Sequence, residues 1–267
     1  SVIETFGDSH KVRYLDKHIK LLADGAIVSQ LMMMRDGYLD GHHGEWIQSP
    51  AEMETISKIF WEKDYQLHIH VNGDKGLDEV ISLIKRRQKE FPRIDHRTTI
   101  VHFANSAEDQ IQTLAELGVI VSANPYYVSG FGERFGEIGL GTDRAHAMAR
   151  LGPIEKAGIS ISLHSDMPIG PSDPLYNVWS AVTRKSSSGQ ALRPDLAMSL
   201  DGAMRAITID AAYSWGMEGT LGSITKGKIA NFTVLAEDPY KVAIDHVKDI
   251  EVMATVFEGK FYPVKNN

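Results

Sequence analysis

The chain has 267 residues, of which 43% are hydrophobic and 24% charged, a composition typical of a globular protein with a large buried core. Its 28 Lys and Arg residues stand against 35 Asp and Glu residues, and no basic block could follow a phosphate backbone, so no nucleic-acid partner is expected. No apolar run approaches the roughly 18 residues of a membrane span, so no membrane partner is expected either. The absence of Cys excludes disulfides and thiolate metal sites.

The first residues, SVIETFGDSHK, contain neither an initiator Met nor an apolar signal core. We therefore expect Ser1 to follow an internal cut in a longer protein. A chain without Cys is compatible with any redox compartment, so localisation stays open, with the cytoplasm favoured.

Short apolar runs that end in polar loops alternate with helical patterns in the first part of the chain. The predicted strands lie within residues 19–27, 65–74, 97–105, 118–127 and 159–168, and predicted helices within 75–90, 106–117 and 201–214. Residues 126–150, which contain many glycines, form a longer predicted excursion. This alternation predicts an α/β fold with a mainly parallel sheet.

The pattern changes near residue 216 to strand-turn-strand. Lys226-Gly227-Lys228 and Glu258-Gly259-Lys260 have the composition of hairpin-like turns. We therefore divide the chain into an α/β part, residues 1–215, and a small β unit, residues 216–267.

Side chains able to bind a metal lie on successive predicted strands: Lys20 early in the first, and His70, His102 and Asp166 near the ends of later ones. Because the carboxyl ends of parallel barrel strands converge on one mouth, we expect these side chains to lie together. A single strand histidine is more often a hydrogen-bonded core residue than a ligand. Several ionisable groups buried together are costly without partners or a metal, so the cluster favours a metal site.

Six motifs follow one another along the chain in a specific order. They are IKLLADGAI around Lys20, HVNGD starting at His70, IVHFAN around His102, LHSDMPIGPSDPL around Asp166, AVTR ending at Arg184, and GSITKGKIANFTVL. In this order and spacing the chain resembles the C-terminal half of an amidohydrolase-superfamily enzyme. The branch it resembles is the amidohydrolase-3 branch, which includes N-substituted formamide deformylase-like proteins.

The resemblance implies a metal-dependent hydrolase on a (β/α)8 barrel, with this chain supplying the last five strands of a partial barrel and a C-terminal β extension. It implies that Lys20 is carbamylated and bridges two metals, that His70 and His102 are ligands, and that Asp166 is the aspartate of the last strand. One or two divalent ions, zinc being expected, would lower the pKa of a bound water to about 7. As the catalytic residue, Asp166 would take the proton of that water and pass it to the leaving nitrogen of a non-peptide C–N bond.

The family's first-strand His-x-His pair has no counterpart here, because Asp8-Ser9-His10 lacks the second histidine. We expect the missing N-terminal half of the same protein as a partner and little activity without it. In the incomplete chain an unmodified Lys20, pointing to solvent or paired with Asp24, is favoured over the carbamate. Two alternatives stay open: an ester or lactone hydrolase, and a non-catalytic fragment or binding module. An assembly of identical copies is also left open.

Five further residues have weaker assignments. His68 is expected to be a hydrogen-bonded core residue, and Asp74 a helix cap in preference to a partner of His70. His164 shares a strand face with Asp166, so packing and contact with a small-molecule substrate are equally expected. Arg184 and Asn124 are candidates for substrate binding, although a surface or ion-pairing role is favoured for Arg184.

Overall fold

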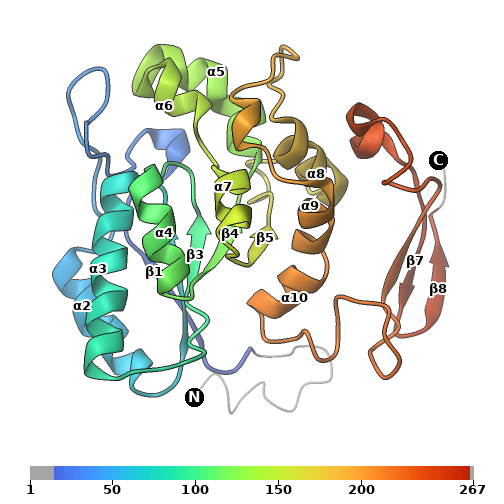
Figure 1. The fold of residues 1–267 in the computed structure, drawn as a ribbon, viewed down its shortest axis with the longest axis horizontal. Helices are drawn as coiled ribbons and strands as arrows, with labels where there is room; N and C mark the ends of the chain where they lie inside the picture. The colour runs from blue at the N-terminus through green and yellow to red at the C-terminus, as the bar shows by residue number, and fades with distance from the viewer. Residues whose placement is uncertain (1–14, 265–267) are drawn as a thin grey trace.

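The computed structural model describes residues 15–264, and its largest element is a parallel five-stranded sheet (Figure 1). The strands lie in the order β1-β2-β3-β4-β5, and each neighbouring pair is parallel. Their bounds are β1 (His18–Leu22), β2 (Gln66–Val71), β3 (Thr99–His102), β4 (Ile120–Ala123) and β5 (Ile161–Leu163). The predicted α/β class and parallel sheet are confirmed, and the carboxyl ends of all five strands meet at one edge. The Asp8-Ser9-His10 segment lies outside the described residues.

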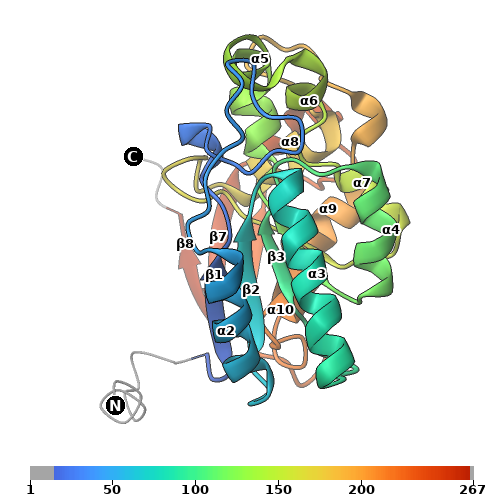
Figure 2. The same ribbon diagram turned by 90° about the vertical axis from the view of Figure 1, so that its left-hand side faces the viewer.

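Helices follow the strands in chain order. They are α2 (Pro50–Trp61), α3 (Asp74–Glu90), α4 (Glu108–Glu116), α7 (Leu151–Lys156) and α8 (Pro174–Thr183). Figures 1 and 2 show α3 and α4 on one face of the sheet. In α3, Leu77, Val80 and Ile84 recur at helical spacing and are buried against that face. No helix within residues 15–264 is long and apolar enough to cross a membrane.

Two helix predictions need correction. Asp74 does not cap α3: Gly73 occupies the cap, and Asp74 is the first helical residue. Its Oδ1 accepts instead from the backbone amides of Arg35 and Lys75. The predicted helix over 201–214 is divided into α9 (Leu200–Ala206) and α10 (Ile209–Ser214), because Thr208 between them has a ψ of −99°.

Two long segments lie beyond the carboxyl ends of the strands (Figure 1). One follows β1 and includes η1 (Ile27–Ser29). The other is the predicted excursion after β4, which forms η2 (Tyr127–Phe131), α5 (Gly132–Phe135), η3 (Gly136–Leu140) and α6 (Thr142–His146). The segments are joined, since Leu39 N donates to Gly139 O over 2.8 Å and the Arg144 guanidinium donates to Gly37 O.

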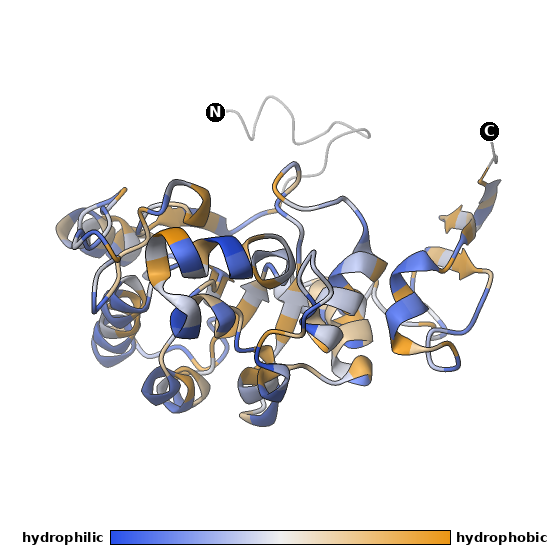
Figure 3. Cartoon of the chain, turned by 90° about the horizontal axis from the view of Figure 1, so that it is seen from above, coloured by the Kyte–Doolittle hydropathy of each residue, from blue (hydrophilic) through white to orange (hydrophobic). Residues whose placement is uncertain are grey.

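The C-terminal part forms a separate antiparallel sheet in the order β6-β7-β8. Its strands are β6 (Phe232–Leu235), β7 (Val252–Phe257) and β8 (Lys260–Pro263), and η5 (Ile244–Asp249) lies between β6 and β7. A further short turn, η4 (Pro194–Leu196), lies earlier in the chain, between α8 and α9. Glu258 and Gly259 have φ values of 49° and 79°, which confirms the predicted hairpin turn between β7 and β8. The turn at residues 226–228 joins no pair of strands. Figure 3 shows hydrophobic and hydrophilic residues alternating along the helices around the parallel sheet.

Candidate active site

His70 and His102 meet at the carboxyl ends of β2 and β3. Their ring centroids lie 4.5 Å apart and the rings are nearly perpendicular. His70 is opposite Val101 in the register, so a regular pleat would turn His102 to the other face of the sheet. The left-handed φ of 78° at His102, followed by 51° at Phe103, instead directs the His102 ring toward His70. Such strained backbone is concentrated at functional sites in proteins.

The Nδ1 atom of His102, at the end of β3, is surrounded by side chains from the segments that follow β4 and β5. The Tyr127 hydroxyl and His164 Nε2 each lie 3.2 Å from it, and Asp166 Oδ2 lies 3.7 Å from it. Asp166 also has a left-handed φ, 52°, and its side chain is 44% exposed. His164 is fixed from behind by Ser122 Oγ, 3.1 Å from Nδ1. The structure therefore brings three histidines and an accessible carboxylate together.

Burial keeps these histidines neutral. It lowers the pKa of His102 to about 2, with the charges of His164, His70 and Lys20 acting in the same direction. It lowers the pKa of His164 to about 4, opposed by Asp166. Burial also lowers the pKa of His70, and the Lys20 ammonium adds to this effect. Neutral imidazole is the form of histidine that binds a metal ion.

Lys20 lies on the edge strand β1 opposite His68 and is exposed. Its ammonium is close enough to lower the pKa of His70, His102 and His164, in each case after burial. The alternative pairing with Asp24 is not observed, and no ion pair of Lys20 is found within residues 15–264.

His68 has the core role expected from its position. It is 9% exposed, its Nε2 lies 2.9 Å from His18 Nδ1, and its ring stacks on Trp215 at a centroid distance of 5.3 Å. Burial, with smaller contributions from His18 and Lys20, lowers its pKa to about 4. These contacts engage the ring of His68, which lies two residues before His70 on β2.

The donor types of the cluster fit a divalent metal, because neutral imidazole and carboxylate are its usual protein ligands. Their arrangement is incomplete. In the described part of the chain, no three His, Cys, Asp or Glu side chains are grouped so that they could hold a metal ion by themselves. This chain thus supplies ligands of the right kind without closing a site.

Arg184 does not join the cluster. Its side chain is 1% exposed, and four guanidinium hydrogens go to backbone carbonyls: Nε to Leu192, Nη1 to Ala149, and Nη2 to His146 and Met148. A guanidinium used in this way has little capacity to bind a substrate. The surface or ion-pairing role favoured above for Arg184 is therefore wrong, because its side chain is buried and binds backbone carbonyls.

Asn124, the other substrate-binding candidate, is fully buried beneath the cluster. Its Nδ2 donates to Ser165 O over 3.1 Å, and its Oδ1 accepts from Tyr126 N over 3.0 Å. Both ends of the amide are therefore engaged, and Asn124 holds the loop that carries Asp166.

A pocket of about 290 Å³ adjoins His164 and Ser165 and offers space beside the cluster. Asn177 lines it, and the Oδ1 of Asn177 is buried without a hydrogen-bond partner.

The contacts of three residues were not predicted from the sequence: Asp24, Asn72 and Tyr127. Asp24 is a carboxylate in an otherwise apolar run, LLADGAI, and Asn72 lies inside the HVNGD motif, so both positions carried a signal. Their partners lie on other segments, which the sequence alone does not bring together.

A model of the amidohydrolase family matches residues 2–262. The chain belongs to this family. It is 31% identical over 247 residues to the N-substituted formamide deformylase of Arthrobacter pascens. The matching region covers 90% of this chain and 44% of that protein. The chain spans about half the length of the relatives it matches.

Solved structures share the fold at low sequence identity. A metal-dependent hydrolase from Pyrococcus horikoshii has a TM-score of 0.73 at 23% identity, covering 85% of this chain and 46% of its own. A Xaa-Pro dipeptidase has a TM-score of 0.62 at 13% identity, covering 93% of this chain and 55% of its own. These likenesses support the amidohydrolase fold.

Proposed function

We propose that this chain is the C-terminal part of a metal-dependent amidohydrolase that hydrolyses a non-peptide C–N bond of a small molecule. The observation that carries the proposal is the meeting of His70, His102 and Asp166 at one edge of the sheet. The similarity to a formamide deformylase supports an amide-type bond.

Lys20, His70, His102 and Asp166 would hold one or two divalent ions, with zinc expected. When bound, the metal supplies a water molecule that is readily deprotonated at neutral pH. The exposed carboxylate of Asp166 is free to accept that proton and to deliver it to the leaving nitrogen. His164 and the pocket beside it would contact the substrate.

Lys20 would act as a carbamate in the complete enzyme. An unmodified ammonium beside two ligands and a metal is disfavoured by repulsion between like charges. The carbamate, formed when the neutral amine of Lys20 adds CO2 and releases a proton, is an anion whose two oxygens could serve as metal ligands. The exposed position of Lys20 on β1 leaves room for the modification.

The missing ligands and strands would come from the N-terminal half of the same protein. In this proposal β1 to β5 are the last five strands of a (β/α)8 barrel, and five strands do not close a barrel. Within residues 15–264, β1 and β5 each have an unpaired edge. A cleft of about 920 Å³ lies between α10 and the strands β6 and β7. In this proposal the N-terminal half would also contact this cleft, and residues 216–267 would form part of a composite β domain.

The proposal is tested by assaying the longer protein, including the upstream half, against matched amides and esters or lactones. We expect turnover of formamides or other non-peptide amides that requires the metal. Hydrolysis of esters or lactones without any amide turnover would favour the ester hydrolase. Retention of metal without turnover of either class would favour a binding module.

A further inference from the structure

We propose that Asn177 is a specificity-determining residue whose side-chain amide donates to a neutral carbonyl oxygen of the substrate, in the pocket beside His164. The inference rests on the proposed function only in taking this pocket as part of the substrate site. Binding to the pocket can be measured without turnover, so a failure of this inference is distinguishable from a failure of the proposed function.

The pocket of about 290 Å³ lies next to the candidate catalytic carboxylate. His164 and Ser165 line it from the segment after β5, and Asn177 lines it from α8. Asp166 follows Ser165 directly in the chain. A substrate whose scissile bond lies at Asp166 can therefore place a neighbouring group in this pocket.

Asn177 has a buried side-chain amide that makes no hydrogen bond. The residue is 4% exposed, and its Oδ1 is buried without a partner. Its Nδ2 also has no hydrogen-bond partner within residues 15–264, but this atom is not sealed from solvent. Because Asn177 lines the pocket, the accessible Nδ2 end of the amide faces it. Buried polar side chains without partners are uncommon in folded proteins, which favours a role for this amide in binding.

Two other polar side chains of the pocket already have partners. His164 has Nδ1 3.1 Å from Ser122 Oγ and Nε2 3.2 Å from His102 Nδ1, so both ring nitrogens are engaged. Asp173 Oδ1 accepts from two backbone amides at the start of α8. Among the described residues that line the pocket, Asn177 is the buried polar residue, and its donor is free.

The walls of the pocket favour a neutral group over an anion. Pro174, Ile207 and Ala211 supply apolar surface, and Asp173 supplies a carboxylate. None of the described lining residues is a lysine or an arginine. A bound carboxylate would lie near Asp173 without a cation in the lining to pair with, and burial of an unpaired charge is unfavourable. A carbonyl oxygen can accept from Asn177 without adding charge.

The test compares the affinities of three formamides whose N-substituents have the same shape. N-formyl-β-alaninamide ends in a carboxamide, N-formyl-β-alanine in a carboxylate, and N-isopentylformamide in a branched hydrocarbon. Isothermal titration calorimetry gives their Kd values for the metal-loaded longer protein carrying Asp166→Asn, in which turnover is expected to be slow. We expect the carboxamide to bind about 3- to 10-fold more tightly than the hydrocarbon, the factor for one neutral hydrogen bond. Equal or tighter binding of the carboxylate or the hydrocarbon, or no binding of the carboxamide, would overturn the inference.

Two substitutions in the same background remove the donor. Asn177→Leu replaces the amide by a hydrocarbon of similar size, so we expect the carboxamide to lose its advantage and the melting temperature to rise, because an unpartnered amide is no longer buried. Asn177→Ala removes the donor by truncation and should abolish the same advantage. A carboxamide preference that survives in both variants would contradict the role of Asn177.

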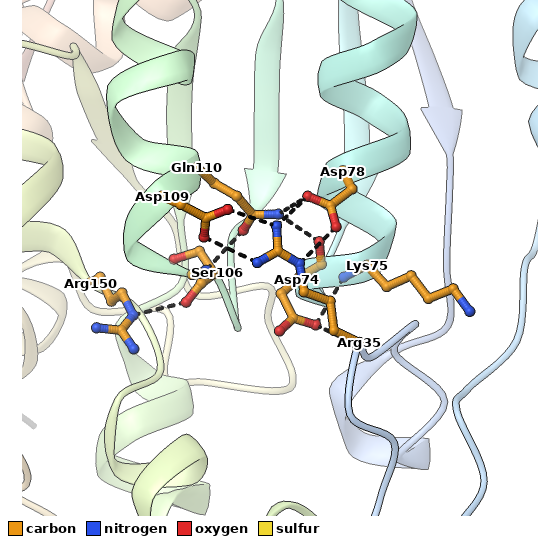
Figure 4. Close-up of polar contacts among 9 residues, drawn as sticks. Arg35, Asp74, Lys75, Asp78, Ser106, Asp109, Gln110 and Arg150 are labelled. Carbon is orange, nitrogen blue, oxygen red and sulfur yellow. Dashed lines mark hydrogen bonds and ion pairs between the residues drawn. The ribbon is translucent and has the colours of Figure 1, made fainter.

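Ser106→Ala is the matched control. Ser106 is 6% exposed and its Oγ is also buried without a partner, but it is not part of the pocket lining. Figure 4 shows Ser106 before α4, where its carbonyl oxygen accepts from Arg150 Nε over 2.8 Å. We expect Ser106→Ala to keep the carboxamide preference, and its loss there would contradict the assignment. If the preference depends on Asn177 but the protein with Asp166 intact hydrolyses none of the three compounds, the proposed function fails and this inference does not.

Discussion

At the scale of single residues, burial of neutral imidazole has a measurable consequence at His68, where it lowers the pKa to about 4. The unfolded chain regains the ordinary value and binds one proton more between about pH 6.5 and 4. The contribution of His68 to stability is therefore complete above about pH 6.5 and is lost as the pH falls toward 4.

We expect the free energy of unfolding of His68→Gln to fall less steeply on acidification. The difference is at most about 1.4 kcal/mol per pH unit, the linkage of one proton. Urea unfolding at pH values between 7 and 4 measures it. His246→Gln is the control, because His246 is exposed on the surface. If the two variants have the same slope, His68 is not the buried neutral base that its contacts indicate.

Substitutions in the cluster should separate proton transfer from metal binding in the longer protein. Asp166→Asn can keep a ligand oxygen but loses its basicity, so turnover should fall by about 100-fold or more while most of the metal is retained. His102→Ala removes a ligand, and we expect metal and activity to be lost together. Metal content by mass spectrometry and kcat on the same samples decide this. Parallel losses in Asp166→Asn would make Asp166 a ligand only.

That His70, His102 and Asp166 lie close together was predictable, because each lies near the end of an apolar strand motif. The way in which the side chains of these residues approach one another was not predictable. The ring of His102 reaches His70 only through a left-handed φ, which nothing in IVHFAN encodes visibly. The buried guanidinium of Arg184 likewise depends on carbonyls up to 38 residues away.

At the scale of elements, Arg35 joins the segment after β1 to two helices. Arg35→Ala removes its guanidinium contacts to Asp78 and Asp109 and leaves these carboxylates close to Asp74. The ion pairs are partly exposed, so we expect a loss of about 1–2 kcal/mol in the free energy of unfolding. Faster amide exchange after β1, measured by hydrogen–deuterium exchange, should accompany it.

The control for Arg35 is Arg193→Ala, which breaks an exposed pair with Asp195 two residues away. That change should cost about 0.5 kcal/mol or less. A similar loss in both variants would mean that Arg35 contributes only a surface ion pair.

The order and type of the strands followed from the sequence because their apolar runs are short, buried and bounded by polar loops. The local interruption of a helix and the position of a helix cap did not follow from the sequence. The helix predicted over 201–214 is interrupted at Thr208, a residue whose type does not itself interrupt a helix. Gly73 occupies the cap of α3, and the carboxylate of Asp74 accepts from the backbone amide of Arg35 instead.

At the scale of the whole molecule, the proposed partial barrel has open edges and exposed apolar surface. Phe257 and Phe261 are 57% and 60% exposed on the C-terminal sheet. Unpaired edges and such side chains favour association between copies. We expect the 267-residue chain alone to self-associate and to have little hydrolase activity, and the longer protein to be better defined in size and active. Sedimentation velocity and amide turnover measure both. A monodisperse, fully active 267-residue chain would contradict the incomplete-barrel account.

The most direct test of the central claim is anomalous X-ray diffraction at the zinc edge from crystals of the metal-loaded longer protein. We predict an anomalous peak in contact with His70, His102 and Asp166, and density for a carbamate on Lys20 if a second peak lies beside the first. A peak bound only by other residues, with the rings of His70 and His102 still in contact with each other as in this structure, would contradict the account.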